Sequence, residues 1–328
     1  KTVNLKLFTM KMLLIRRNAM RFFDLHCDTI YEITKKNGDI FKNDFSVSLE
    51  KTKNLKSYIG CFAVWIPDSL RGWAAFDFFE KCQKTLHAQS KKHENMVRIC
   101  KSADDIEKIK NEGGNGIILT VEGSSALGGD ISRVSHLKKC GVKIMTLTWN
   151  GVCEAGDGAK VNNPKGLTKF GKNLVKKLEE NDIIIDISHA SEKLFYDVAE
   201  ICEKPIVATH SNCKKICGNP RNLTDEQIKI IKEKGGLIGL TFCKDFLSNS
   251  KNASRDDIVR HFEHFLSLSC EDNLAFGSDF DGADTPEEIS SIDKIENLYE
   301  YFLKKGYKEN LLDKVFFSNA YNFVNKVF

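Results

Sequence analysis

Short apolar segments alternate with amphipathic segments along nearly the whole chain, and this alternation is the strongest constraint on the fold. Eight segments are almost continuously apolar: 22–28, 59–66, 116–123, 143–150, 183–190, 205–211, 237–242 and 274–282. Seven others show largely helical spacing of apolar residues: 76–96, 131–141, 167–181, 191–202, 223–235, 254–269 and 292–306. Strands that are apolar on both faces are typical of a parallel sheet covered by helices. The alternation therefore predicts an α/β fold.

The number of strands favours one parallel architecture over another. Eight strands that alternate with helices can close into a (β/α)8 TIM barrel, and 328 residues is a usual length for that fold. An open, doubly wound sheet is the alternative. Because no low-complexity or Pro/Gly/Ser-rich segment divides the chain, we expect one barrel domain over residues 21–328. Residues 1–20 are expected to form an N-terminal extension, part of which could derive from an expression vector.

Polar residues stand at the carboxyl ends of several apolar segments. His26 and Asp28 have i, i+2 spacing, which directs both side chains to one face of a strand. Glu122, His189 and His210 lie at the ends of three further segments. In a barrel these ends converge on one mouth, where the active sites of this fold lie. One such histidine alone would be structural more often than not, but several ionisable groups at equivalent positions favour a functional site.

Imidazole and carboxylate groups in this arrangement favour a pair of divalent metal ions. His26 and Asp28 could bind one ion, and His189 with His210 could bind the second. Glu122 could bridge the ions through its two oxygens. This ligand set favours Zn²⁺, with manganese, cobalt and iron also open. If these residues were purely structural instead, the protein would bind no metal.

A water shared by two such ions would be ionised near neutral pH, and its use as a nucleophile needs a group that takes its proton. Asp279, near the end of the eighth apolar segment, is the candidate, because an ionised carboxylate can take a proton from an activated water and pass it to a leaving group. The histidines outside the strand ends fall in helical patterns, where solvated or capping roles are expected: His87, His93, His136, His261 and His264. Cys27 points to the opposite face of its strand from His26 and is expected in the core.

Composition excludes some partners and suggests a compartment. The net charge is only +4, and no basic stripe with interleaved aromatic residues occurs, so we expect no nucleic-acid partner. The apolar stretch near the N-terminus is interrupted by Lys6 and Lys11 and is too short to span a bilayer. Eleven scattered cysteines, an odd number, favour free thiols in a reducing compartment. We therefore expect a cytoplasmic protein without a membrane partner.

Six fragments in order resemble signatures of the membrane (renal) dipeptidase family, the M19 metallopeptidases. They are DLHCDTI, VEGSSAL, TLTWN, DISHAS, THSNCKKICGNPRNLTDEQI and FGSDFDG, and the resemblance covers nearly everything from residue 22 to 328. It implies a barrel of the amidohydrolase kind with two zinc ions. It also implies that His26 and Asp28 ligate the first ion, that Glu122 bridges, and that the remaining two strand-end histidines, His189 and His210, ligate the second.

The resemblance further implies roles for three residues around the metals. Arg221 matches the arginine that binds the terminal carboxylate of the substrate, a role that suits a bidentate guanidinium. Asp279 matches the aspartate that handles the proton. Trp149 departs from the pattern, since several members carry a histidine there that contacts the scissile carbonyl. The indole N–H is a single donor, so Trp149 could polarise the carbonyl or simply shape the pocket.

These observations predict a binuclear metallo-dipeptidase. The expected substrate is a small dipeptide with a free C-terminal carboxylate, including one with a C-terminal D-residue. One alternative is another hydrolase of the same barrel type, acting on a cyclic amide, a lactone or an N-acyl amino acid. A second alternative is a metal-binding relative without catalysis. Family habit suggests a homodimer.

Overall fold

Parallel strands close into a barrel in the computed structural model, which describes residues 20–250 and 252–328. The barrel strands are β1 (Arg21–Cys27), β2 (Ser57–Trp65), β4 (Gly114–Glu122), β5 (Val142–Thr146), β6 (Ile184–Asp186), β7 (Val207–Ala208), β8 (Leu237–Leu240) and β9 (Leu274–Phe276). Each pairs in parallel with its neighbours; β1 pairs with β2 and β9, and β2 pairs with β4. These pairings complete the ring, so the predicted TIM barrel is confirmed and the open sheet is excluded.

The described residues also contain a ninth strand that the apolar pattern did not predict. β3 (Val97–Ile99) pairs with Asn115–Ile117 at the start of β4, and β5 pairs with the later part of the same strand. β3 has only three residues, and its central residue, Arg98, is exposed. A short strand on which only Val97 is fully buried leaves no apolar run, which is why the pattern missed it.

Several predicted strands are longer than the strands that form. The segment 205–211 forms only β7, and 143–150 ends as a strand at Thr146. Beyond these points the chain leaves the sheet for largely buried loops, which include the half-buried Trp149 and the fully buried His210 near the mouth. Burial therefore continues past the end of the ladder, and hydrophobicity alone could not locate where the hydrogen bonding stops.

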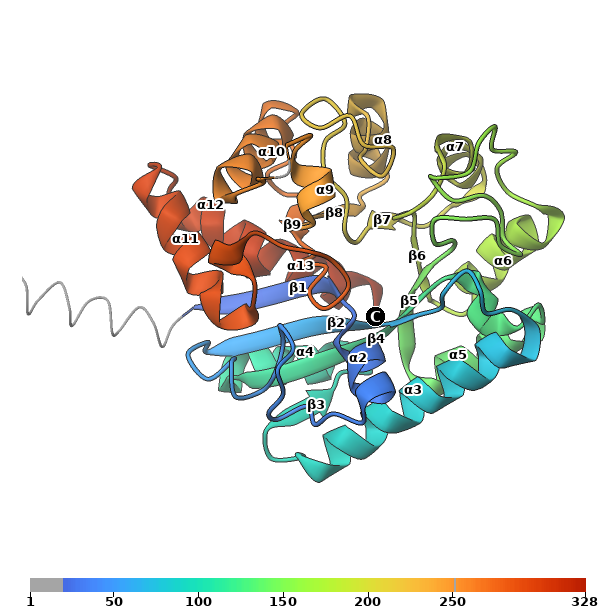
Figure 1. Cartoon of the computed structure of the whole chain (residues 1–328), viewed down its shortest axis with the longest axis horizontal. Coiled ribbons are helices and arrows are strands. Elements are labelled where there is room, and N and C mark those ends of the chain that lie inside the picture. Colours follow the sequence, from blue (N-terminus) through green and yellow to red (C-terminus); the bar gives the residue numbers. More distant parts are fainter. Residues whose placement is uncertain (1–19, 251) are drawn as a thin grey trace, which may run out of the picture.

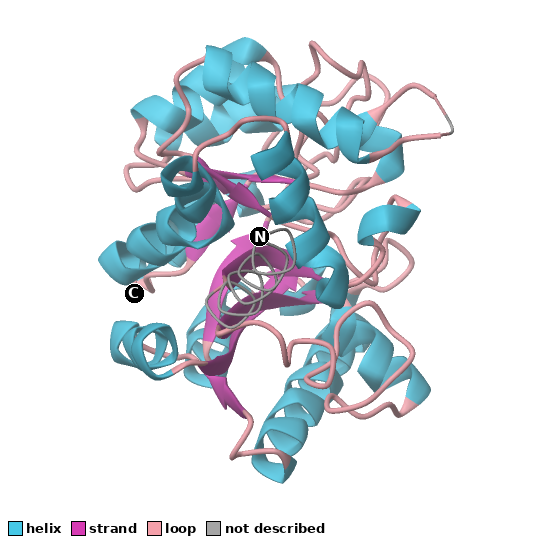
Figure 2. Cartoon of the chain, turned by 90° about the vertical axis from the view of Figure 1, so that its left-hand side faces the viewer, coloured by secondary structure: helices cyan, strands magenta, loops and turns pink. Residues whose placement is uncertain are grey.

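Helices surround the ring of strands (Figure 1), and Figure 2 shows the strands enclosed between helices. The α-helices are α2 (Thr29–Lys36), α3 (Gly72–Lys92), α4 (Ala103–Glu112), α5 (Val134–Cys140), α6 (Lys169–Glu180), α7 (Glu192–Ile201), α8 (Asp225–Glu233), α9 (Lys244–Leu247), α10 (Arg255–Ser267), α11 (Ile295–Lys304), α12 (Glu309–Asp313) and α13 (Asn319–Val327). A π-helical turn, Lys314–Ser318, precedes α13. The seven predicted helices all form; α2, α4, α9, α12 and α13 were not predicted.

The C-terminal segment closes the end of the barrel opposite the mouth. Phe317, Tyr321 and Val324 join a cluster with the inward residues near the start of the strands, such as Phe23 and Leu237. The rings of Phe23 and Phe317 lie 6.1 Å apart. A second, larger cluster fills the space between the strands and the outer helices. Because apolar side chains fill this end, the polar chemistry is confined to the carboxyl ends of the strands.

Candidate metal centre

The predicted ligands come together at the carboxyl ends of the strands. His26 is the penultimate residue of β1 and Asp28 follows that strand directly, while Glu122 is the last residue of β4. His210 lies two residues after β7, and His189 lies three residues after β6. All five are buried. Segments from four strands therefore supply a single cluster of nitrogen and oxygen donors.

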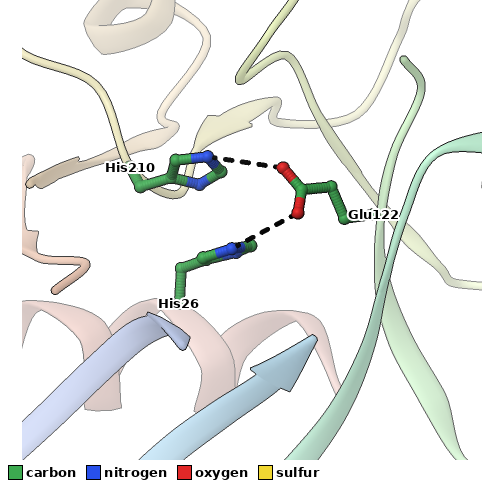
Figure 3. A group of neighbouring side chains, drawn as sticks. All are labelled: His26, Glu122 and His210. Atoms are coloured by element: carbon green, nitrogen blue, oxygen red, sulfur yellow. Dashed lines mark ion pairs between the residues drawn. The ribbon is translucent and has the colours of Figure 1, made fainter. Parts of the chain in front are cut away.

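Glu122 occupies the centre of this cluster. Its Oε2 lies 3.6 Å from His26 Nε2, and its Oε1 lies 2.7 Å from His189 Nε2 and 3.6 Å from His210 Nε2. Figure 3 shows the carboxylate of Glu122 facing the imidazoles of His26 and His210. Asp28 Oδ2 lies 3.5 Å from His26 Nε2 on the other side. The two oxygens of Glu122 thus face two different groups of ligands, which is the arrangement a bridging carboxylate needs.

Hydrogen bonds assign the lone pairs of two imidazoles to the interior of the cluster. Thr209 Oγ1 lies 2.6 Å from Asp186 Oδ2, to which it donates, so it can only accept from His210 Nδ1, 2.9 Å away. His189 Nδ1 lies 3.0 Å from the acceptor Asn150 Oδ1. Both histidines therefore carry their proton on Nδ1 and an electron pair on Nε2. Their Nε2 atoms are 2.8 Å apart, where two lone pairs repel unless a cation lies close to both.

Buried polar atoms without hydrogen-bond partners give a second indication of cations. Within the described residues these atoms include His26 Nε2, Asp28 Oδ1 and Glu122 Oε1. Burying such groups without a partner costs free energy, and a coordinated cation would remove that cost. Two overlapping ligand groups are close enough to hold an ion: His26 with Glu122 and His210, and His26 with Asp28 and Asp279. The residues fit divalent cations that accept imidazole and carboxylate, such as zinc.

The electrostatics of the cluster are those of closely packed ligands without neutralising charge. Burial lowers the pKa of His26, but Glu122, Asp28 and Asp279 outweigh it and raise that pKa to about 10. Burial raises the pKa of Glu122 well above its usual value, and the nearby carboxylates add to the effect. Burial and the positive charges of Arg221 and His26 hold the pKa of His189 well below its ordinary value. Neutral histidine is the form that binds a metal.

Asp279 lies at the edge of the same cluster. Its Oδ1 is 4.0 Å from His26 Nε2, and the residue lines the cavity that opens above the ligands. Burial, with the charge of Asp28, raises the pKa of Asp279 to about 6, although His26 and Arg221 oppose the shift. Its backbone has a φ of 63°, in the left-handed region. A carboxyl group that titrates near neutral pH suits proton transfer, and the unusual backbone conformation of Asp279 is of a kind found at functional sites.

A cavity of about 390 Å³ opens above the ligands. One wall is aromatic: the ring centroids of Tyr31 and Trp65 lie 4.9 Å apart, and those of Trp65 and Trp149 lie 5.0 Å apart. Trp149 continues this wall to within 6.2 Å of the His189 ring. Trp149 therefore lies where it can contact a bound molecule, in the loop after β5 rather than in the strand.

Arg221 does not line this cavity; it lies beside the metal cluster, against the backbone of His210. It is buried, its Nη2 donates to the backbone oxygen of His210 at 3.2 Å, and its Nε has no hydrogen-bond partner. The guanidinium also lies 5.0 Å from the ring centroid of Phe246, a residue that lines the cavity. A buried guanidinium whose Nε has no partner, beside the cavity wall, has a donor available for an anion.

Two buried aspartates that the sequence analysis did not single out support the ligands. Asp24 accepts hydrogen bonds from the backbone and the hydroxyl of Ser278, at 2.7 and 2.6 Å, and burial raises its pKa to about 7. Asp186 accepts from the hydroxyls of Thr146 and Thr209, each at 2.6 Å. Each aspartate lies shortly before a site histidine in the sequence. An acid inside an apolar run was the signal that could have revealed them.

One expectation for the other histidines was wrong. His261 was expected to be solvated or to cap a helix, yet it is fully buried. Its Nδ1 accepts from the backbone N–H of Cys213 at 3.1 Å, and its Nε2 lies 3.0 Å from the backbone oxygen of Leu247. His261 thus fastens α10 to the segment that follows His210. The apolar period predicted that the segment containing His261 is a helix, but it could not predict which segments of the chain pack against this histidine.

A parallel barrel that gathers histidines and carboxylates at its mouth defines a metal-dependent hydrolase. The chain belongs to the membrane dipeptidase family, peptidase family M19, whose sequence profile matches residues 15–327. It is therefore an enzyme of the metallopeptidase class, a hydrolase that acts on dipeptides, and it depends on divalent metal. The family, the fold and the class of enzyme predicted from the sequence are confirmed.

Comparison with individual proteins supports this assignment. An uncharacterized protein in the pqqA 5′ region of Klebsiella pneumoniae is 33% identical over 233 residues, which is 68% of this chain and 86% of that protein. The crystal structure of the dipeptidase AC, an M19 metallopeptidase, superposes with a TM-score of 0.88 at 25% identity, covering 94% of this chain and 99% of that one. A Rhodobacter sphaeroides metallopeptidase liganded with a phosphinate mimic of L-Ala-D-Ala shares the fold, with a TM-score of 0.87, 24% identity and coverage of 94% and 100%.

Proposed function

We propose that the chain is a binuclear zinc dipeptidase that cleaves dipeptides with a free C-terminal carboxylate, including those with a C-terminal D-residue. The observation that carries the proposal is the position of Glu122, whose Oε2 faces His26 and whose Oε1 faces His189 and His210. The dipeptide mimic in the Rhodobacter sphaeroides structure of the same fold supports the substrate class.

The proposed ligand sets follow the two sides of the cluster. His26 and Asp28 would hold one ion, His189 and His210 the other, and Glu122 both. When bound, the two ions supply Lewis acidity for the scissile carbonyl and lower the pKa of the attacking water. The chain contributes fixed geometry, because the tautomers of His189 and His210 are set by neighbouring hydrogen bonds.

Asp279 is the proposed proton carrier. Its pKa of about 6 lets it accept a proton from water and return it to the departing amine near neutral pH. Arg221 is the proposed partner of the substrate carboxylate, since its Nε is buried without a hydrogen-bond partner. Trp149 is proposed to hold the substrate against the aromatic wall and to offer its indole N–H to the carbonyl.

The test is metal content and hydrolysis measured on one sample. The purified enzyme, reconstituted with zinc, is assayed against L-Ala-D-Ala, L-Ala-L-Ala, a lactone, a cyclic amide and an N-acyl amino acid, before and after chelation. At least two zinc ions per chain and dipeptide cleavage lost on chelation are expected. Two ions with turnover of only the other substrates would overturn the dipeptidase proposal. Absence of bound metal after reconstitution would overturn the proposal that these residues form a metal centre.

A cytoplasmic location and a homodimer are also proposed. The eleven cysteines carry free thiols, which supports a reducing compartment. Among the described residues, no helix is long and apolar enough to cross a membrane. Cell fractionation tests the location. Sedimentation tests the dimer, which would be overturned by a single species with the 37.1 kDa mass of one chain.

A further inference from the structure

A second group of metal-binding side chains lies outside the catalytic cavity. It consists of Glu80 on α3 and of His136 and Cys140 on α5, and none of the three lines the cavity. Their ligand atoms all lie within 4.8 Å of one another. Figure 1 shows α3 and α5 running side by side, and the rings of Phe76 and His136 on these helices are 5.7 Å apart.

The helix period places two of the three donors on one face. His136 and Cys140 are separated by four residues, so their side chains lie one above the other on α5. Cys140 Sγ is 3.5 Å from His136 Nε2. A tetrahedral zinc ion with bonds of about 2.0 Å to nitrogen and about 2.3 Å to sulfur holds these two atoms about 3.5 Å apart. The existing separation therefore already suits a shared cation.

Glu80, on the opposite helix α3, offers the third ligand atom of the site. Its Oε1 is 2.6 Å from His136 Nε2, a hydrogen-bonded distance, whereas two ligands of one zinc ion lie about 3.4 Å apart. A carboxylate shift of less than about 1 Å would open that space. The other oxygen, Oε2, is 3.3 Å from Gln83 Nε2 and 3.5 Å from Lys84 Nζ. These contacts hold Oε2 and leave Oε1 directed at the histidine.

Charge and exposure allow a metal to enter. A divalent cation would be neutralised by the carboxylate of Glu80 and the thiolate of Cys140. Burial and Glu80 raise the pKa of the Cys140 thiol, so the metal-free cluster keeps a proton there that metal would displace. The His136 side chain is 44% exposed, which leaves a fourth position open to water.

We propose that Glu80, His136 and Cys140 form a third metal site, which binds a zinc-class transition-metal ion and links α3 to α5. The simpler arrangement is an ion pair between Glu80 and His136 that makes no use of Cys140. The two arrangements differ in one measurable respect: only the metal site places a thiolate on a metal ion. The proposed catalytic ligands are all nitrogen and oxygen donors, so a metal–thiolate signal reports this site alone.

The experiment titrates Co²⁺ into enzyme that has received only two equivalents of zinc, which the fully buried catalytic ligands bind before the exposed outer site. We expect one further equivalent to bind and a thiolate-to-cobalt charge-transfer band to appear in the near-ultraviolet. Cys140→Ser should abolish the band, and His136→Gln and Glu80→Gln should each weaken cobalt binding by about tenfold or more. Cys243→Ser is the matched control, because Cys243 lines the catalytic cavity, and this variant should keep the band.

Three results would overturn the proposal. They are the absence of a further equivalent in the wild-type enzyme, a band that survives in Cys140→Ser, and a band that is lost in Cys243→Ser. Far-ultraviolet circular dichroism and zinc content of each variant establish that it is folded with a filled catalytic centre. Since three different substitutions address the site, failure of one variant to fold leaves the test intact.

Discussion

Gly282 lies against Asp28 so closely that a Cβ atom at position 282 would come within 2.0 Å of Asp28 Oδ2. The same atom would lie 2.9 Å from Asp279 Oδ1. A residue without a side chain is therefore required beside two carboxylates of the metal cluster. The glycine of the FGSDFDG segment is thus part of the site, although it carries no reactive group.

Gly282→Ala is expected to displace Asp28 and to weaken the ion proposed to bind there. Zinc content should fall by about one ion per chain, and kcat should drop by about 100-fold because a ligand is misplaced. Zinc analysis and dipeptide turnover on the same preparation are the measurements. Gly218→Ala is the control, since a Cβ there meets nothing within 4 Å. Equal zinc content in the two variants would contradict the prediction.

Asp279→Asn should remove proton transfer while the metal ions stay bound. The amide keeps the shape of the side chain but cannot accept the proton, so kcat should fall by about 100- to 10,000-fold. Steady-state kinetics and metal analysis measure the two effects separately. Asp284→Asn, at an exposed carboxylate on the cavity rim, is the control. Near wild-type turnover by Asp279→Asn would rule out the role.

Arg221→Lys tests recognition of the substrate carboxylate. Loss of a bidentate charged hydrogen bond should lower kcat/KM for a dipeptide by about 10- to 100-fold. The value of kcat/KM for a dipeptide amide, which lacks the carboxylate, should fall much less. The comparison of the two substrates is internal to each variant, so a general defect in folding cannot imitate it. An equal loss for both substrates would show that Arg221 serves the fold instead.

Thr209→Val should weaken metal binding although Thr209 is not a proposed ligand. The substitution keeps the shape but removes the hydroxyl between Asp186 and His210, which sets the tautomer of that histidine. Zinc affinity, measured by competition with a chelator, should decrease by about 10- to 100-fold. Thr120→Val is the matched control, because Thr120 Oγ1 is buried without a hydrogen-bond partner. An unchanged zinc affinity in Thr209→Val would contradict the prediction that this hydroxyl supports metal binding through His210.

His261 should make the stability of the protein fall in mild acid. Burial lowers the pKa of folded His261 from 6.5 to about 4, so between these values the unfolded chain binds a proton that the folded chain does not. The free energy of unfolding therefore decreases as the pH falls through this window, by about 3 kcal/mol at most. Below about pH 4 this contribution is constant.

Urea unfolding of metal-free enzyme at several pH values measures the effect. His261→Gln lacks the titrating group, so its stability should depend on pH less steeply, by about 1.4 kcal/mol per pH unit, between pH 5 and 6. Metal-free enzyme is used because zinc binding is itself pH-dependent. Parallel curves for the wild type and the variant would contradict the prediction.

The barrel and the composition of the cluster were both predictable from the sequence alone. Strands apolar on both faces require covering helices, and residues at the carboxyl ends of parallel strands must meet at one mouth. His26, Glu122 and His210 could therefore be grouped before any contact was known. Local sequence spacing is enough to predict this grouping. Each apolar segment marks a strand, and because all strands run in parallel, the residues that end these segments lie at the same end of the barrel.

Only the tertiary structure decided how that cluster is supported. Ser278 is 254 residues away from Asp24 in the sequence, yet its hydroxyl bonds that buried carboxylate. The need for glycine at position 282 and the burial of His261 likewise depend on atoms from distant segments. The C-terminal helix α13 also depends on distant contacts, because it closes the end of the barrel opposite the mouth by packing against residues near the start of the strands. Periodicity shows which face of an element is buried, but contacts across the fold decide what each face meets, and these leave no local pattern.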